Sequence, residues 1–554
     1  MIRFSLGLGA AICLATSLRA ADSVPVMDTT PPVITGAPVL TPNANPAVPL
    51  VATITYTTNE PTQTYLAIND GTTVRSFLAD PAYVTFHRVA VLGCKANRTH
   101  TIRVTARDQG GNAAAAPNML TFVTPQLPAD FPPMINTVSL PTRMEPGLTL
   151  FQASYTTPGN PNGPTGSYIV MIDNKGEPVW FYRPTGEGVG LATMMRNGHL
   201  LYLTGGFVAG TRAVELDLFG TKVATWASTG LGTTPPAGAI HVATDSFHHE
   251  IRELRPAEEA DFVALSFEMR TFANYPANEV DTSIVDPSAN VVGDVIVEFK
   301  RDGTIVRETK LLDVLDPYRI CYNSLATLYN TVYPGFATKD WSHGNSVLVD
   351  YSDNTYIYSA RHQDAVVKIK RDTGQIVWIC GPHDRWQAPW SNYLLTPIGA
   401  GFEWNFHQHD PEIGFQNRIV IFDNGNYRVV PPNAPAPTNT WYSRAVEYAI
   451  NPMTMTVEQT WVYGGPGSAQ FYSGFLGGSK PLPRTGNVLV TDGAKAQGPT
   501  TAARIVEVAH NVNPGVAVFE TTIKDPTSTV NWTVYRSERI PGIYPVAWGN
   551  LIAH

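Results

Sequence analysis

The sequence contains little charge. Lysine, arginine, aspartate and glutamate make up only 15% of its 554 residues, and the formal net charge is −8. A chain with so little positive charge has no broad attraction for nucleic acid or for an anionic membrane surface. Any anion that the protein binds is therefore held by a local group of cations. The chain is not disordered, because 43% of its residues are hydrophobic.

Cysteine is also scarce. Of the four cysteines, Cys13 lies in the first 20 residues, which leaves Cys94, Cys321 and Cys380. Three cysteines form at most one disulfide, and a Cys321–Cys380 pair is one option. No Cys-x-x-Cys pair occurs, which argues against a thiolate zinc site and against a dithiol redox motif.

Long apolar runs are missing after residue 20. The first 20 residues combine Arg3, an apolar run over 4–18 and the small residues Ala20 and Ala21. This pattern predicts a signal peptide over 1–20, and the alternative is an N-terminal membrane anchor. We expect the mature protein to be periplasmic or secreted, with no membrane insertion after removal of the signal.

Glycine and proline are abundant, with 45 of each, and helical apolar periodicity is absent. Short alternating segments between turn residues are typical of an all-β protein. Residues 22–125 predict a small immunoglobulin- or fibronectin-like β-sandwich, and a proline-rich linker follows over 125–133. The alternating segments of this region cover 50–56, 64–68, 84–91 and 100–106.

A hairpin pattern recurs six times in the rest of the chain. Each copy has two alternating strands around a Gly, Asp or Pro turn, and most second strands end on Trp or Tyr. Segments of a second kind lie between the copies. This repetition predicts a six-bladed β-propeller over 134–554. The copies cover 168–182, 212–226, 294–310, 365–378, 445–463 and 504–520.

Three histidines occupy matching places in the repeat. Alignment of the segments that precede inner strands places His249, His343 and His409 at equivalent positions in three blades. Equivalent inner positions converge on a propeller axis. Antiparallel hairpins then return Arg361 beside His343 and Asn424 beside His409.

A cluster of three imidazoles and a guanidinium can form three kinds of site. Three histidines are a common zinc set, but an adjacent arginine repels a metal ion. A structural network of hydrogen-bonded histidines is the second possibility. The third is an anion site with a nucleophile, since arginine binds sulfate or phosphate oxygens and neutral imidazole attacks. We favour the third, with no metal and no cofactor.

An ordered set of motifs resembles the bacterial aryl-sulfate sulfotransferase family over nearly the whole mature chain. It comprises Phe247-His-His-Glu-Ile251, Asp340-Trp-Ser-His-Gly-Asn-Ser346, Ser359-Ala-Arg-His-Gln363, Gln408-His-Asp410, Phe422-Asp-Asn-Gly-Asn426, Tyr442-Ser-Arg-Ala-Val-Glu-Tyr448, Val457-Glu-Gln-Thr-Trp461 and Tyr535-Arg-Ser-Glu-Arg539.

The resemblance implies transfer of a sulfuryl group from a phenolic sulfate ester to a phenol, with no nucleotide sulfate donor. It implies that His409 is the nucleophile and that His249, His343 and Arg361 support it, with His248 as the alternative to His249. It also implies a homodimer formed through the sandwich. The departure from the family is the missing disulfide partner near Cys380.

The implied reaction is a ping-pong transfer through a sulfohistidine. In it Arg361 and His343 bind the sulfuryl oxygens, and His249 protonates the leaving phenolate. We expect substrate contacts from Phe247, His248, Trp341 and Asn424, with Trp404 and Tyr427 as further aromatic candidates. The alternatives are an aryl sulfate hydrolase, a quinone-dependent dehydrogenase and a non-catalytic propeller that binds a glycan or a protein.

Overall fold

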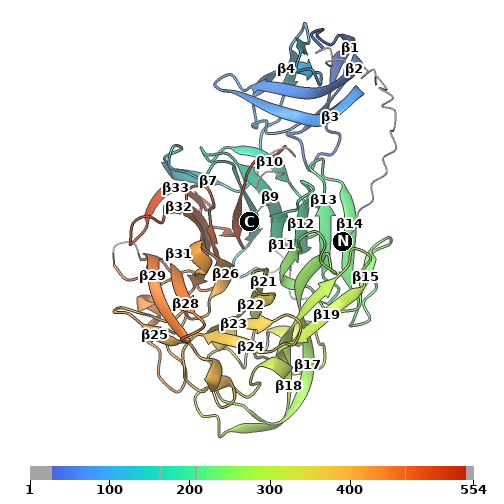
Figure 1. Ribbon diagram of the computed structural model, residues 1–554. Coiled ribbons are helices and arrows are strands. Elements are labelled where there is room, and N and C mark those ends of the chain that lie inside the picture. The colour runs from blue at the N-terminus through green and yellow to red at the C-terminus, as the bar shows by residue number, and fades with distance from the viewer. Residues whose placement is uncertain (1–27, 161–164, 206–208, 468–469, 545–554) are drawn as a thin grey trace, which may run out of the picture.

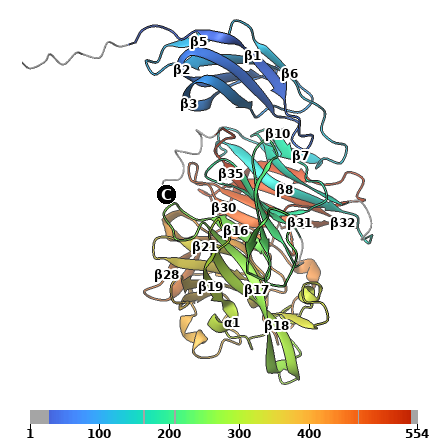
Figure 2. The same cartoon turned by 90° about the vertical axis from the view of Figure 1, so that its right-hand side faces the viewer.

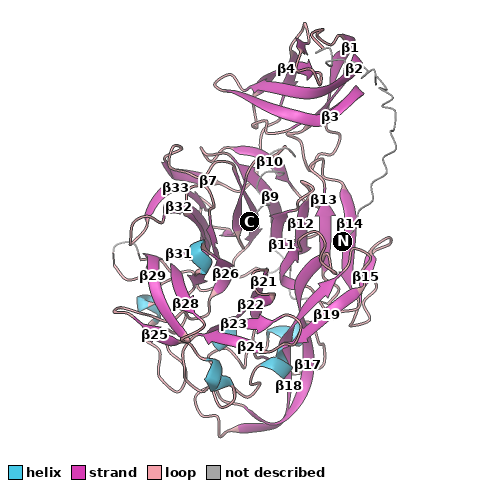
Figure 3. Cartoon of the chain, viewed as in Figure 1, coloured by secondary structure: helices cyan, strands magenta, loops and turns pink. Residues whose placement is uncertain are grey.

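The computed structural model describes residues 28–160, 165–205, 209–467 and 470–544. Strands dominate these ranges (Figure 3), so the prediction of an all-β protein is confirmed. The predicted signal peptide, residues 1–20, lies outside the described residues. No helix in the described ranges is long and apolar enough to cross a bilayer. The helical segments are α1 (Leu311–Val314), η1 (Leu328–Thr331), η2 (Arg361–Gln363), η3 (Trp390–Tyr393), η4 (Phe415–Asn417) and η5 (Thr438–Thr440).

The N-terminal region forms one six-stranded sheet, which lies at one end of the molecule (Figures 1 and 2). The segments 50–56 and 64–68, expected as two strands, belong to the single strand β2. Register shifts between Thr57 and Tyr65 separate its two halves. Because all six strands join one sheet, the two sheets of a sandwich are not separated here. The strands are β1 (Ile34–Pro42), β2 (Ala52–Asn69), β3 (Val74–Val91), β4 (Thr99–Arg107), β5 (Ala113–Ala115) and β6 (Leu120–Val123).

Six further sheets follow, which we number in chain order. The first contains β8 (Leu148–Thr156), β9 (Gly166–Ile172), β10 (Pro178–Tyr182), β34 (Asn531–Thr533) and β35 (Ser537–Ile540). The second contains β11 (Val189–Met194), β12 (Leu200–Thr204), β13 (Arg212–Leu216), β14 (Lys222–Ser228) and β15 (Ile240–Val242). The third contains β16 (His248–Glu253), β17 (Phe262–Pro276), β18 (Val285–Phe299), β19 (Ile305–Lys310) and β20 (Thr338–Asp340).

The fourth sheet contains β21 (Gly344–Asp350), β22 (Thr355–Ala360), β23 (Ala365–Lys370) and β24 (Ile376–Cys380). The fifth contains β25 (Thr396–Ile398), β26 (His409–Ile413), β27 (Ile419–Asp423), β28 (Arg444–Asn451) and β29 (Thr456–Gly464). The sixth contains β7 (Met134–Ser139), β30 (Gly478–Pro481), β31 (Val488–Gln497), β32 (Thr500–Ala509) and β33 (Val516–Ile523).

The two ends of this region are interlocked. The C-terminal strands β34 and β35 pair with β8 of the first sheet, and the early strand β7 pairs with β33 of the sixth. Neighbouring sheets contact each other in chain order through β8, β11, β16, β21, β26 and β30, and β31 contacts β35. The six sheets therefore surround a common centre (Figure 1).

All six hairpins predicted from the repeat are present, each as an antiparallel pair. The turn between β18 and β19 shows why its glycine is needed. Gly303 has a φ of 87° and donates its N–H to the Lys300 carbonyl at 2.8 Å. A Cβ at this position would lie 2.1 Å from the His241 carbonyl oxygen. The turn therefore admits only glycine.

The tryptophans at the ends of outer strands link one sheet to the next. The indole N–H of Trp180 donates to the Leu218 carbonyl at 3.0 Å, and that of Trp461 donates to the Val512 carbonyl at 3.0 Å. Between them in the chain, Trp226 donates to the Arg301 carbonyl at 2.8 Å. Each acceptor lies in the outer turn of the following sheet. The recurring Trp thus buries its ring and fixes the angle between neighbouring sheets.

Replacing Trp226 with Phe keeps an aromatic ring against Phe262 but removes the bond to Arg301. We expect a loss of about 1–3 kcal/mol, because the Arg301 carbonyl is left without its donor. Differential scanning calorimetry should show a lower unfolding midpoint. Trp441→Phe is the matched control, since Trp441 donates only within its own loop, to Ala436. An equal shift in both variants would contradict a bond between sheets.

Candidate functional site

The structure brings the three predicted histidines together at the centre of the six sheets. His249 lies on β16, His343 directly precedes β21, and His409 begins β26. The ring centroids of His249 and His343 are 5.0 Å apart. The ring of Tyr535, from the segment between β34 and β35, lies 5.9 Å from His249 and 6.5 Å from His409.

The backbone positions of these histidines are only partly equivalent. His249 and His343 both have left-handed φ values, 56° and 46°. His409 is not left-handed, whereas His407 and Asp410 on either side of it are. The repeat alignment therefore holds for the first two histidines, and the third reaches the same centre from a different backbone conformation.

The hydrogen bonds of Asn424 determine the tautomer of His409. The Asn424 amide Nδ2 donates to the carbonyls of Ser473 and Leu476, at 2.7 and 2.9 Å. Its Oδ1 therefore faces His409, whose Nδ1 lies 2.7 Å away. Because an amide oxygen only accepts, His409 carries its proton on Nδ1, and the lone pair is on Nε2.

The same reasoning determines the tautomer of His249. The Nε2 of His248 lies 2.9 Å from the Ser266 carbonyl and donates to it. Neutral His248 then has an unprotonated Nδ1, which lies 2.9 Å from Nδ1 of His249. His249 must donate in this contact, so its lone pair is also on Nε2. Both ring nitrogens of His248 are occupied in this way, which favours His249 over His248 as the reactive residue.

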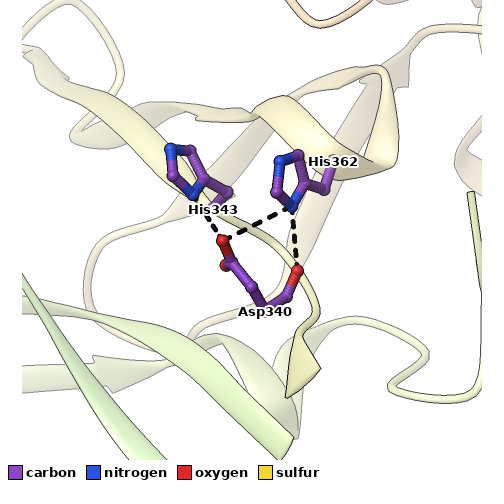
Figure 4. Close-up of side chains that lie close together, drawn as sticks. All are labelled: Asp340, His343 and His362. Carbon is purple, nitrogen blue, oxygen red and sulfur yellow. Dashed lines mark hydrogen bonds and ion pairs between the residues drawn. The ribbon is translucent and has the colours of Figure 1, made fainter. Parts of the chain in front are cut away.

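His343 bonds to a carboxylate. Its Nδ1 lies 2.6 Å from Oδ2 of Asp340, which is fully buried at the end of β20 (Figure 4). The ring of His362 stacks on His343 with centroids 4.5 Å apart, and its Nδ1 donates to the Asp340 carbonyl at 2.9 Å. The carboxylate of Asp340 accepts a hydrogen bond from Nδ1 of His343 and orients the ring, as in an Asp–His catalytic pair.

Asp340, His343 and His362 also form a cluster of possible metal ligands, with one ligand atom of each within 4.8 Å of the others. Two histidines and a carboxylate are a frequent metal set. Here, however, both Nδ1 atoms are at hydrogen-bond distance from Asp340, and the Nε2 of His362 accepts from Arg361 at 2.8 Å. These contacts fit a hydrogen-bonded network with defined proton positions beside the charge of Arg361.

Arg361 lies in η2, directly after β22, whose last residue Ala360 pairs with Gly344. The hairpin thus places the arginine beside His343, as expected from the sequence. Its two terminal nitrogens donate to His362 and to the Gly474 carbonyl at 3.0 Å. The buried Nε has no hydrogen-bond partner among the described residues. The guanidinium is held rigidly and retains a donor for an anion.

Burial keeps His249 and His409 neutral. It lowers the pKa of His409 well below its usual range, and the nearby Arg361 lowers it further. Burial and then the neighbouring His343 have the same effect on the pKa of His249. A neutral imidazole keeps its nucleophilic lone pair at physiological pH.

Arg536 connects the segments that carry the three histidines. Its guanidinium lies 2.6 Å from Glu250 and 3.1 Å from Asp410, the residues that follow His249 and His409. It also donates to the carbonyl of Asn345 at 2.5 Å, two residues after His343. One buried side chain from the C-terminal segment therefore fixes three inner strands.

The four residues predicted to contact substrate do not all lie beside the cavity. Trp341 is fully buried and donates to the Arg319 carbonyl at 3.1 Å, so it packs the core between sheets. Asn424 orients His409, as described above. Phe247 stacks on Phe299, with centroids 5.5 Å apart, and together with His248 it lines a cavity beside His249.

The further aromatic candidates lie away from His249. Trp404 packs against Phe402, and Tyr427 stacks on Tyr322 with centroids 4.5 Å apart. Tyr427 also lies 5.3 Å from the ring of His407. Neither residue lines the cavity beside His249.

The sequence reasoning missed four residues of the site: Asp340, His362, Tyr535 and Arg536. The first two adjoin predicted residues, and a carboxylate three positions before His343 was a usable signal. The other two come from the C-terminal segment, which only the closure of the six sheets brings to the centre.

Cys94, Cys321 and Cys380 are all free and buried. Burial raises the pKa of each thiol to about 12. They are therefore protonated and unreactive at neutral pH.

Comparison with known proteins gives a consistent picture. A family model described as "Arylsulfotransferase (ASST)" matches residues 135–536. "Arylsulfate sulfotransferase AssT" of Escherichia coli O6:H1 is 32% identical over 221 residues, which cover 33% of this chain and 36% of that protein. The protein of the same name from Lelliottia amnigena is 26% identical over 223 residues, covering 33% and 37%. The alignments thus span about a third of these relatives.

Among solved structures, a protein of unknown function from Bacteroides caccae covers 71% of this chain and 98% of its own. It is 10% identical with a TM-score of 0.32, too low to carry an argument.

The contacts of Asn424 predict one tautomer for His409. In ¹⁵N spectra of histidine-labelled protein, His409 should remain neutral and Nδ1-protonated down to pH 5, because burial lowers its pKa. Asn424→Leu removes the acceptor, and a mixture of tautomers should appear. Asn136→Leu, which alters a distant turn at Lys175, is the control and should leave the signal unchanged. Titration of native His409 near pH 6.5 would refute the lowered pKa of this residue.

Proposed function

The chain belongs to the arylsulfotransferase family, and we propose that it moves a sulfuryl group from a phenolic sulfate ester to a phenol through His409. The observation that carries this proposal is the setting of His409. It is a neutral, buried imidazole with its lone pair on Nε2, and it lies in the field of Arg361. An oriented neutral nucleophile beside a rigid cation suits transfer of an anionic group.

We infer that the six sheets are the blades of a β-propeller. The sandwich over residues 22–125 stays a prediction, because the described strands of this region join one sheet. The ordered contacts between β8, β11, β16, β21, β26 and β30 support the propeller, as does the interlocking of the two ends through β7 and β34. The site then lies on the propeller axis, where inner strands of several blades converge.

In the first step the sulfate ester binds with its SO₃ oxygens facing Arg361. The Nε2 lone pair of His409 forms a bond to sulfur while the bond from sulfur to the phenolic oxygen breaks, and sulfohistidine results. The proton on Nδ1 of His409 stays there throughout, hydrogen-bonded to the Asn424 Oδ1. By analogy with phosphoryl transfer, negative charge spreads over the peripheral oxygens, and fixed donors stabilise it.

Proton transfer falls to His343 in this proposal. Its Nδ1 lies 2.6 Å from the carboxylate of Asp340, which is the arrangement of an Asp–His general acid–base pair, whereas His249 has no carboxylate on its Nδ1, which faces His248. His343 therefore protonates the leaving phenolate, which replaces the role expected for His249. The acceptor phenol returns a proton to His343, attacks sulfur and restores the lone pair of His409. No proton is gained or lost over the cycle.

Phenols suit this exchange because their pKa is about 10, so phenolate is a fair leaving group and donor and acceptor are nearly equal in energy. The sulfohistidine must be kept from water. Burial of the site supports this, since His409 is 2% exposed and Arg361 is 7% exposed.

We also propose export to the periplasm or beyond, based on the apolar residues 4–18 and the small residues after them. A homodimer through residues 22–125 is part of the same proposal and rests on the resemblance alone. The three buried thiols are free, so the proposed location outside the cytoplasm does not depend on a disulfide between them.

His409→Ala should abolish transfer, with a fall in rate of at least about 10⁴-fold, because the nucleophile is lost. Incubation of native protein with an aryl sulfate, followed by intact-mass measurement, should show addition of one SO₃ group that is labile to acid. The variant should show none. Normal turnover by the variant would refute the proposal, and phenol release without a sulfated acceptor would identify a hydrolase instead.

Arg361→Lys should lower the turnover number by about 100-fold, as expected for loss of a donor to the transition state. A lysine retains the charge but cannot bond at once to His362, to Gly474 and to an anion. Steady-state kinetics with one donor and one acceptor measure the effect. Arg183→Lys is the control, because Arg183 is half exposed and pairs with Asp130 outside the site. Equal activity in both variants would contradict the role of Arg361.

A further inference from the structure

A cavity of 280 Å³ lies directly beside His249 and Tyr535. It is nearly twice as large as the cavity of about 150 Å³ that accommodates benzene in an apolar protein interior. It therefore has room for more than one aromatic ring. Its walls are Gln152, Ser154, Ser167, Gly188, Val189, Gly190, Leu203, Thr204, Gly205, Phe247, His248, His249, Leu476, Thr533 and Tyr535.

Three glycines of the second sheet form part of this wall, and their backbone does not require glycine. Gly188, Gly190 and Gly205 lie outside the left-handed φ region. The nearest atoms to a Cβ at these positions are 3.8, 3.5 and 3.5 Å away, which is ordinary van der Waals contact.

Other glycines with ordinary φ are confined by their surroundings. A Cβ at Gly166, for example, would lie 2.6 Å from Tyr155, and one at Gly293 would lie 2.4 Å from Leu312. Among the described glycines outside the left-handed region, only the three in the cavity wall have no contact closer than 3.4 Å. Neither a left-handed φ nor a contact below 3.4 Å requires glycine at these positions, although Gly190 lies at a register shift in β11. The space beside the three glycines belongs to the cavity.

The polar groups of the wall bond largely to the protein itself. Ser154 and Ser167 bond to each other at 2.9 Å, and the Val189 N–H donates to Ser167 at 3.2 Å. The Oε1 of Gln152 accepts the Tyr535 N–H at 2.7 Å. Leu203, Leu476 and the ring of Tyr535 add apolar surface. Such a wall selects by shape and by apolar contact more than by hydrogen bonds.

We propose that Gly188, Gly190 and Gly205 set the size of the aryl group, and that the cavity takes the fused second ring of a bicyclic aromatic substrate such as a naphthol ester. This rests on the proposed function, which places the reacting oxygen between His249, His343 and His409. The side of the cavity lined by His249 and Tyr535 faces that point. A flat glycine wall then receives the part of the ring system that lies away from sulfur.

The test replaces Gly190 and Gly205 with valine, singly, and compares 2-naphthyl sulfate with phenyl sulfate as donors. Valine suits a strand, so the fold should tolerate it. The ratio of kcat/KM for naphthyl over phenyl sulfate should fall about tenfold or more, the range that one or two carbon groups confer in an apolar pocket. Gly414→Ala, directly before η4 and outside the cavity, is the control and should leave the ratio unchanged.

A second measurement separates this inference from the proposed function. Calorimetric titration of His409→Ala protein with 2-naphthol and with phenol needs no catalysis. Naphthol should bind more tightly, and Gly205→Val in the same background should remove most of that preference. An unchanged naphthyl-to-phenyl ratio in both assays would overturn the glycine wall. Loss of the binding preference without any transfer by native protein would overturn only the sulfotransferase proposal.

Discussion

The site depends on the buried guanidinium of Arg536. It pairs with Glu250 and Asp410 and binds the Asn345 carbonyl, so it fixes the chain next to each of the three histidines. Removing one partner of a buried pair costs about 3–5 kcal/mol in general; here Glu250 and Asp410 would keep Arg252 as a second cation but lose the one that joins them to Asn345. The arginine comes from the last strands of the chain and its acceptors from the third, fourth and fifth sheets. The site is therefore complete only when the C-terminal segment packs against these three sheets.

Each central histidine differs in what its Nδ1 contacts, and this difference divides the chemistry between them. His409 faces a neutral amide and His249 faces another imidazole, so burial leaves both uncharged. His343 faces the carboxylate of Asp340, which accepts a hydrogen bond from its Nδ1. Geometry alone places three similar rings at one point. In the proposed function, the groups that face Nδ1 distinguish His409, the nucleophile, from His343, the residue that exchanges protons.

Much of this arrangement follows from local sequence. Turn residues and alternation located all six hairpins, and antiparallel return placed Arg361 and Asn424 correctly because both lie within one hairpin of their histidine. Contacts between segments that are far apart in the chain could not be predicted from the local sequence. Arg536 reaches the centre only through pairing of β35 with β8. Trp341 was expected to touch substrate, but its indole N–H finds the Arg319 carbonyl in the core, 22 residues away in the chain.

In the proposed function, chemistry and selectivity come from different sheets. The side chains of the proposed reaction lie on β16 and β26, directly before β21 and directly after β22, where buried ion pairs and hydrogen bonds leave little freedom for change. The glycine wall belongs to the second sheet, between β11 and β12, which contributes no group to the proposed reaction. A substitution in that wall alters the space for the aryl group while the Arg536 contacts stay intact. Substrate range can therefore change by single residues without disturbing the histidines.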